Sequence, residues 1–230
     1  MERRNLMNII DELEWRGAIN QQTDAEGLYK LVDQKSISLY CGIDPTGDSM
    51  HIGHLIPFMI LKRFQLAGHH PVILIGGGTG AIGDPSGRTT ERVLQTAEQV
   101  KHNADSLTAQ MKKLFGEDGS FTMMNNYDWL SKISLLDFLR DYGKLFNINT
   151  MLAKDVVASR METGISFTEF SYQILQSIDY KMLYEKCGVQ LQIGGADQWG
   201  NITNGIELIR KTNETHEAFG LTIPLMLKAD

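Results

Sequence analysis

Short apolar runs alternate with longer amphipathic stretches along this chain. Four of the runs have the length and composition of buried β-strands: 36–44, 70–75, 121–126 and 189–193. The amphipathic stretches repeat apolar positions at steps of three and four, as helices do: 55–66, 93–114, 135–146, 168–184 and 202–211, with a further one at 11–31 that is broken near 17–24. Apolar strands that alternate with helices indicate an α/β fold, in which helices cover both faces of a parallel sheet.

Composition limits what such a protein can be. Of the 230 residues, 42% are hydrophobic and 22% are charged, which is ordinary for a globular protein, and no apolar run approaches the roughly 18 residues needed to cross a bilayer. Two cysteines are too few for a disulfide framework, and the first residues do not resemble a signal peptide, so we expect a cytoplasmic protein. The net charge of −6 argues against a broad nucleic-acid-binding face.

Polar clusters follow the predicted strands, at 40–54, 76–88, 125–128 and 194–198. Ligands of parallel sheets bind at the carboxyl ends of the strands, so we expect these clusters to meet around one site.

The run from His51 to His54 follows the first strand and opens a helix. The first N–H groups of a helix lack internal partners and the helix dipole is positive there, so two imidazoles and a glycine at this point favour a phosphate site. A metal pair and two incidental surface histidines are the alternatives, but no further His or Cys set stands nearby to complete a metal site.

The glycine-rich loop at 76–83 is neither a Walker loop nor a dinucleotide fingerprint. Asp84 at its end suits an ammonium group, or is simply a turn aspartate. Tyr172, Gln176 and Asp179 fall on one stripe of the helix at 168–184, which suits a small polar ligand or a solvated face. Asp197 follows the strand at 189–193 and suits ribose hydroxyls or an amine, or caps the next helix.

These segments together resemble the class I aminoacyl-tRNA synthetases, and among them the bacterial type of tyrosyl-tRNA synthetase, from Trp15 to Asp230. The motifs that carry the resemblance are LYCGIDPT at 39–46, HIGH at 51–54, GDPSG at 83–87, GISFTEFSY at 164–172 and QIGGADQWGN at 192–201. The resemblance implies a Rossmann-like doubly wound parallel sheet with flanking helices and an inserted helical segment at about 125–165.

The resemblance also implies a reaction. The carboxylate of L-tyrosine would attack the α-phosphate of ATP, with Mg²⁺ on the phosphates, and tyrosine would then pass from the adenylate to tRNA(Tyr). No tightly bound cofactor and no protein metal site are expected. A tyrosine pocket must reject phenylalanine, and the known device in tyrosyl-tRNA synthetases is a set of buried phenol partners that the wrong substrate leaves unpaired.

By the same resemblance, three groups of residues would do this work. The phenol would meet Tyr40 and Asp179, the ammonium group Asp84, Tyr172 and Gln176, and the remainder of the tyrosyl group Gln192 and Gln198. ATP and the adenylate would contact these residues: Cys41, Gly42, Asp44, Gly53, Gly195 and Asp197. The residues that act on the phosphates and ribose in catalysis would be these: Thr46, His51, His54, Arg88 and Arg92.

Members of this family continue past residue 230 into a lysine-rich loop and anticodon-reading domains. We therefore expect residues 1–230 to be a catalytic domain without the anticodon-binding and C-terminal RNA-binding domains. Such a fragment would bind tyrosine, activate it poorly and discriminate tRNA weakly. Family members are homodimers, and we expect the interface in the inserted segment.

Three rival interpretations remain at this point. A tryptophanyl-tRNA synthetase is the nearest, although Tyr40 and Asp179 favour a phenol over an indole. A small nucleotidylyltransferase would share the HIGH run but would not need the stripe at 172–179. A non-catalytic, synthetase-derived binding fragment is the third.

Overall fold

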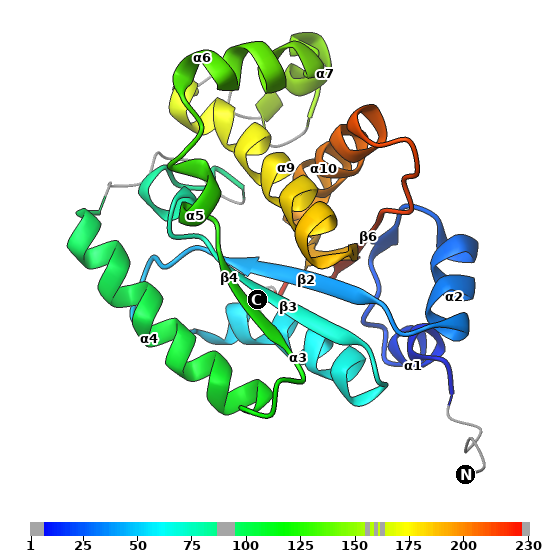
Figure 1. Ribbon diagram of the computed structural model, residues 1–230. Helices are drawn as coiled ribbons and strands as arrows, with labels where there is room; N and C mark the ends of the chain where they lie inside the picture. Colours follow the sequence, from blue (N-terminus) through cyan, green and yellow to red (C-terminus); the bar gives the residue numbers. More distant parts are fainter. Residues whose placement is uncertain (1–6, 87–94, 155–156, 159–160, 162–163, 227–230) are drawn as a thin grey trace.

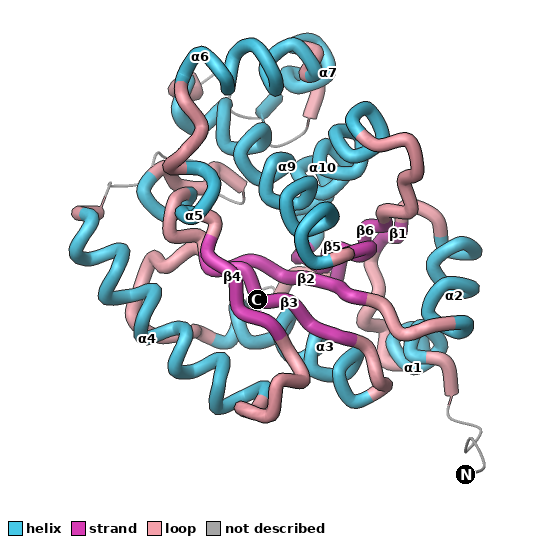
Figure 2. Tube along the Cα trace, viewed as in Figure 1, coloured by secondary structure: helices cyan, strands magenta, loops and turns pink. Residues whose placement is uncertain are grey.

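The computed structural model describes residues 7–86, 95–154, 157–158, 161 and 164–226. Within these residues six strands form one sheet (Figure 2). Their order across the sheet is β1 (Gln21–Gln22), β6 (Phe219–Ile223), β5 (Val189–Gly195), β2 (Ser38–Ile43), β3 (His70–Ile75) and β4 (Thr122–Asn125). All neighbouring strands are parallel except β1, which pairs antiparallel with β6.

Helices cover both faces of the sheet, which makes three layers (Figure 1). One face packs against the N-terminal half of the chain: α1 (Ile9–Trp15), α2 (Ala25–Gln34), α3 (Ile52–Leu66) and α4 (Ala97–Phe115). The other face packs against α9 (Phe167–Cys187) and α10 (Trp199–Thr212). The structure therefore confirms the predicted α/β fold with a doubly wound parallel sheet.

Alternation along the strands divides the core in two. In β2, Leu39, Cys41 and Ile43 pack into the cluster on the α3 and α4 side, whereas Tyr40 packs into the cluster on the α9 and α10 side. Successive side chains of a strand point to opposite faces, so this division follows directly from the extended backbone. It brings the Tyr40 side chain to the side of the sheet where α9 lies.

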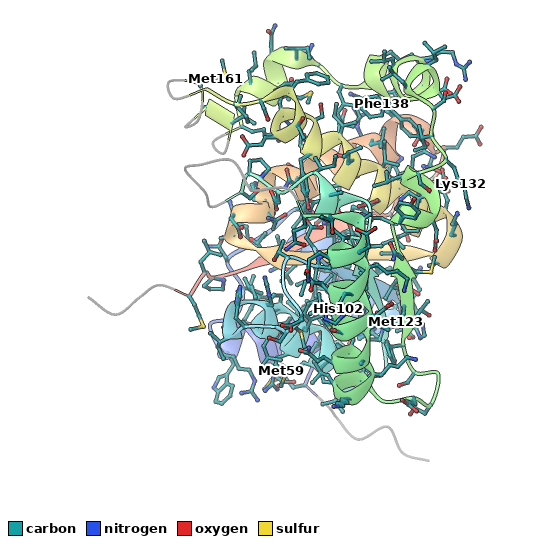
Figure 3. The ribbon with its side chains drawn as sticks, turned by 90° about the vertical axis from the view of Figure 1, so that its left-hand side faces the viewer. Met59, His102, Met123, Lys132, Phe138 and Met161 are labelled. Carbon is teal, nitrogen blue, oxygen red and sulfur yellow. The ribbon has the colours of Figure 1, made fainter. Side chains whose placement is uncertain are left out.

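A helical segment follows β4, and its later part lies at the top of the molecule in Figure 1. It contains α5 (Tyr127–Leu130), α6 (Leu135–Asp137), a π-helical turn (Phe138–Tyr142), a 3₁₀ turn (Gly143–Leu145) and α7 (Ile148–Leu152). Figure 3 labels Phe138 and Met161 within it. The prediction of one regular helix over 135–146 is thus wrong, because the segment changes from α-helix to π-helix at Phe138. It changes again, to a 3₁₀ turn, at Gly143, a residue of low helix propensity.

The four predicted strands are confirmed, with ends shifted by at most two residues. The helix predicted at 93–114 begins at Ala97, where Thr96 caps it by accepting from the N–H of Gln99, and Val93 lies outside the described residues. Sequence reasoning missed β1 and β6. β6 lies between β1 and β5, so it extends the sheet on the side of β2 opposite to β3 and β4.

Candidate active site

One cavity of about 490 Å³ opens at the carboxyl ends of the strands. It lies where the strand order reverses, because the chain runs from β2 outward to β3 and β4 and then returns to β5 on the other side of β2. Such switch points are where open parallel sheets hold their ligands. All sixteen predicted site residues that the structure describes line this cavity, whereas Arg88 and Arg92 lie outside the described residues.

Tyr40 and Gln192 stand side by side at the floor of the cavity, paired in register across β2 and β5. Tyr40 is 1% exposed and Gln192 is 4% exposed. Among the described residues, neither the Tyr40 hydroxyl nor the Gln192 Oε1 atom has a hydrogen-bond partner. A buried polar group without a partner costs free energy, so both atoms are suited to a ligand that would satisfy them.

Asp179 lies near Tyr40 and is held by two donors from the segment after β4. Trp129 Nε1 donates to its Oδ1 atom at 2.8 Å, and Asn126 Nδ2 donates to its Oδ2 atom at 2.9 Å. Burial raises the pKa of Asp179 to about 7, although these two hydrogen bonds oppose the shift. Asp179 therefore carries a carboxylate whose charge changes close to neutral pH.

Asp44, just past the end of β2, is held in a similar way. Thr79 donates its hydroxyl to Oδ1 at 2.7 Å, and Tyr172 donates its hydroxyl to Oδ2 at 2.9 Å. Asn126 Nδ2 also donates to the Thr79 hydroxyl at 2.9 Å, so Asn126 and Thr79 connect the two carboxylates. The pKa of the Tyr172 hydroxyl is raised, first by burial and then by Asp44 and Asp84, which keeps this hydroxyl a donor.

Asp84, Gln176 and Gln198 form the next wall, and Asn201 supports it from outside the lining. Asp84 accepts from the Ser86 N–H and from Gln198 Nε2, both at 2.8 Å. Gln176 Nε2 donates to Gln198 Oε1 at 3.1 Å, and Asn201 Nδ2 donates to Gln176 Oε1 at 2.9 Å. Asp84 is therefore a turn aspartate and a cavity residue at once, and burial raises the pKa of its carboxyl.

The HIGH run forms the more open end of the cavity. His51 is the N-cap of α3 and its Nδ1 atom accepts from the Gly53 N–H at 3.1 Å. The rings of His51 and His54 stack with their centroids 3.6 Å apart. Thr46 and Gly53 line the same end, which combines ring donors, a hydroxyl and the positive end of a helix.

Cys41, Gly195 and Asp197 also line the cavity, on the neighbouring strands β2 and β5 or just beyond them. Burial raises the pKa of the Cys41 thiol to about 12, so this thiol is neutral at physiological pH. At Gly195 a Cβ atom would come within 2.5 Å of Asp197 Oδ1, so a side chain there would displace Asp197.

Three residues that matter to this geometry were not predicted individually: Thr79, Asn126 and Trp129. The cluster at 125–128 includes Asn126, but nothing in the local pattern indicates that Asn126 and Trp129 hold Asp179 from about fifty positions away. Thr79 sits in a glycine-rich turn and is 2% exposed, a burial that its sequence neighbours do not indicate.

The described residues contain no group of three or more His, Cys, Asp or Glu side chains placed to hold a metal ion. None of their helices has the length and apolar character that a membrane crossing requires.

Comparison with known proteins identifies the family. A family model described as tRNA synthetases class I (W and Y) matches residues 32–230. Tyrosine–tRNA ligase 1 of Enterococcus faecalis is 77% identical over 226 residues, and the tyrosine–tRNA ligase of Latilactobacillus sakei is 75% identical over 224. Each match covers 97% of this chain and 54% of the relative, so the chain spans about half the length of these curated relatives.

The solved structures agree. A C-terminally truncated mitochondrial tyrosyl-tRNA synthetase of Aspergillus nidulans superposes with a TM-score of 0.87 at 34% identity, and the match covers 97% of this chain and 70% of that one. The shared fold, the matched family model and the 75–77% identity to bacterial relatives all indicate the same family. The chain therefore belongs to the class I tRNA synthetases of the tryptophan and tyrosine group, within the tyrosyl-tRNA synthetases.

Proposed function

We propose that this chain forms the tyrosine- and ATP-binding part of a tyrosine–tRNA ligase. In this reaction the carboxylate of L-tyrosine attacks the α-phosphate of ATP. A bond forms between the carboxylate oxygen and the α-phosphorus, the bond to the bridging oxygen breaks, and pyrophosphate leaves. The tyrosyl group then passes to a ribose hydroxyl at the 3′ end of tRNA(Tyr), and AMP leaves.

The single observation that carries the proposal is the Tyr40 hydroxyl, buried without a partner among the described residues, in a cavity that Asp179 also lines. A phenol bound there would accept from Tyr40 and donate to the ionised Asp179. Phenylalanine would leave both groups unpaired inside the protein, which is the known basis of discrimination in tyrosyl-tRNA synthetases. An indole offers no acceptor for Tyr40, which disfavours tryptophan as the substrate.

The other walls suit the remaining parts of the substrates. Asp44 and Asp84 would attract the ammonium group, and the α3 N-terminus with Thr46 and His51 would meet the phosphates. Mg²⁺ would arrive with ATP and neutralise phosphate charge. The protein's own contribution is then positioning and charge stabilisation rather than covalent chemistry.

Two measurements test this function. Titration calorimetry should give binding of L-tyrosine and much weaker binding of L-phenylalanine and L-tryptophan. The full-length protein should also exchange labelled pyrophosphate into ATP only when L-tyrosine is present. Exchange that depends on tryptophan would mean that the substrate is tryptophan rather than tyrosine. If no amino acid binds at millimolar concentration, the proposal of an aminoacyl-tRNA ligase is refuted.

We further infer a cytoplasmic homodimer whose interface includes the helical segment after β4. Supporting this, large apolar side chains are exposed there: Leu135 at 72%, Leu136 at 75%, Leu139 at 52% and Ile148 at 56%. Large apolar side chains exposed close together in sequence favour association. Sedimentation should give a dimer that Leu136→Lys converts to monomer, while Trp15→Lys, at an equally exposed site on α1, leaves the dimer intact. A monomer at all concentrations would refute the interface.

A further inference from the structure

We infer that three amide side chains, Gln95, Asn103 and Gln110, position the turn at residues 45–50 for the activation step. We call these three residues the amide clamp. Asn103 and Gln110 belong to α4, and Gln95 precedes it. The turn connects β2 to α3 and carries Thr46, so the inference rests on the proposed ATP-binding function.

Asn103 is the centre of the clamp. Its side chain is 1% exposed. The preceding residue on α4, His102, is exposed to solvent and is labelled in Figure 3. Its Nδ2 atom donates to the Pro45 carbonyl at 3.0 Å and to Gln95 Oε1 at 3.3 Å, and its Oδ1 atom accepts from Gln99 Nε2 at 3.0 Å. These partners fix which way the amide faces.

The other two amides hold the backbone on either side of this point. Gln95 Nε2 donates to the Thr46 carbonyl at 3.0 Å. Gln110 Nε2 donates to the Asp48 carbonyl at 2.9 Å, and its Oε1 atom accepts from the Met50 N–H at 3.1 Å. Within the turn the Thr46 N–H donates to the Asp44 carbonyl at 2.8 Å, and the clamp side chains add the contacts above to the rest of its backbone.

The clamp ties this turn to a rigid element. Asn103 and Gln110 are seven residues apart, two turns of helix, and therefore share one face of α4. Leu107 and Met111, on the same helix, are 1% and 0% exposed and pack into the core cluster that includes β2 and β3. Displacement of the turn relative to the sheet would therefore require breaking clamp hydrogen bonds or moving α4.

This arrangement predicts a selective effect. Thr46 lies inside the turn and His51 follows it directly, whereas the tyrosine end of the cavity is built from β2, β5, α9 and the segment after β4. Small displacements of groups that contact a reacting phosphate strongly reduce the reaction rate. Loss of the clamp should therefore impair the use of ATP and leave tyrosine binding intact, so the clamp residues are positioning residues rather than catalytic ones.

Two variants at Asn103 separate the donor from the shape of the side chain. Asn103→Leu keeps the volume and removes every hydrogen bond, while Asn103→Asp keeps the shape and the acceptor for Gln99 but removes the donor to Pro45. In tyrosine-dependent pyrophosphate exchange with the full-length protein, both variants should lower kcat/KM for ATP by about tenfold. This is the size of effect expected when one hydrogen bond is lost. The Kd for L-tyrosine should change by less than about twofold.

Gln65→Leu is the matched control. Gln65 makes the same kind of contact elsewhere, since its Nε2 atom donates to the Phe115 carbonyl at 3.1 Å and to the Ser120 hydroxyl at 2.6 Å, away from the cavity lining. This variant should be destabilised without losing ATP efficiency. If Asn103→Leu fails to fold, Gln110→Leu tests the clamp by the same measurements, because Gln110 is only half-buried.

Two results would overturn the inference. One is unchanged ATP kinetics in folded Asn103 and Gln110 variants. The other is a tyrosine affinity that falls in step with ATP efficiency, which would mean general damage. The proposed function fails separately, if the unchanged protein shows no tyrosine-dependent exchange at all.

Discussion

Trp129 Nε1 donates a 2.8 Å hydrogen bond to Oδ1 of Asp179, and both side chains are almost fully buried. Two residues fifty positions apart are thereby held together beside the cavity that Asp179 lines. The indole supplies a donor that a buried, ionised Asp179 needs.

Trp129→Phe tests this contact. The ring is retained but the donor is lost, so the charged form of Asp179 becomes less stable and its pKa rises further. We expect tyrosine affinity measured by calorimetry to fall about tenfold, in line with one hydrogen bond to a charged group. Trp15→Phe, at a site 76% exposed, should have no effect. Undiminished tyrosine affinity in Trp129→Phe would contradict the role of this hydrogen bond.

The pKa of Asp179, raised to about 7, predicts a pH dependence. Under the proposed function a substrate phenol would donate to the ionised carboxylate, and this form is lost as pH falls through the pKa. Tyrosine affinity should therefore level off above pH 7 and weaken below it, approaching tenfold per pH unit. L-phenylalanine lacks the phenol and serves as the control, because groups that meet only the ammonium and carboxylate affect both ligands alike. A tyrosine-to-phenylalanine affinity ratio that is constant with pH would contradict the assignment.

Gly76 predicts a steric effect on the other carboxylate. A Cβ atom at this position would overlap Asp44 Oδ1 and lie 2.6 Å from the Thr79 hydroxyl. Gly76→Ala should push Asp44 off both of its hydrogen-bond donors and lower tyrosine affinity together with thermal stability. Gly143→Ala, where the nearest atom would be 3.6 Å away, is the control and should be neutral in both measurements. Equal behaviour of the two variants would show that Asp44 is not held as described.

The two cysteines should differ in reactivity. Only the thiolate is strongly nucleophilic, and burial raises the pKa of Cys41 to about 12, whereas Cys187 is half-buried with a smaller upward shift. Iodoacetamide at about pH 8 should therefore alkylate Cys187 in the folded protein and Cys41 only after denaturation. Peptide mass spectrometry measures both. Rapid native labelling of Cys41 would mean that the cavity floor opens in solution.

Sequence patterns predicted the fold well where they were regular. The apolar runs of β2 and β3 were recognisable because strands buried on both faces have few polar positions. In β5, Gln190 and Gln192 alternate with buried apolar residues, which is also a strand pattern, and β4 is a short, half-buried strand. β6 was missed because Gly220 and Thr222 interrupt its apolar residues, even though Thr222 is 0% exposed. Its burial comes from neighbouring strands, which the local sequence does not contain.

The resemblance names residues that line one cavity, but it does not give the hydrogen bonds that hold them in place. The strand–turn–helix pattern predicts an anion site at the HIGH run, and this stays a prediction. Nothing local indicated that Trp129 and Asn126 hold Asp179, or that Asn103 holds the Pro45 carbonyl. These partners are distant in sequence, and the apolar spacing at 93–114 predicts only a helix.

The cap that His51 makes on α3 determines the tautomer of its imidazole. Because Nδ1 accepts from the Gly53 N–H, the neutral ring must carry its proton on Nε2. The Nε2–H group of that ring is then left to donate to another partner, while Nδ1 stays engaged in the cap. The first turn of the helix adds its own positive potential at the same place.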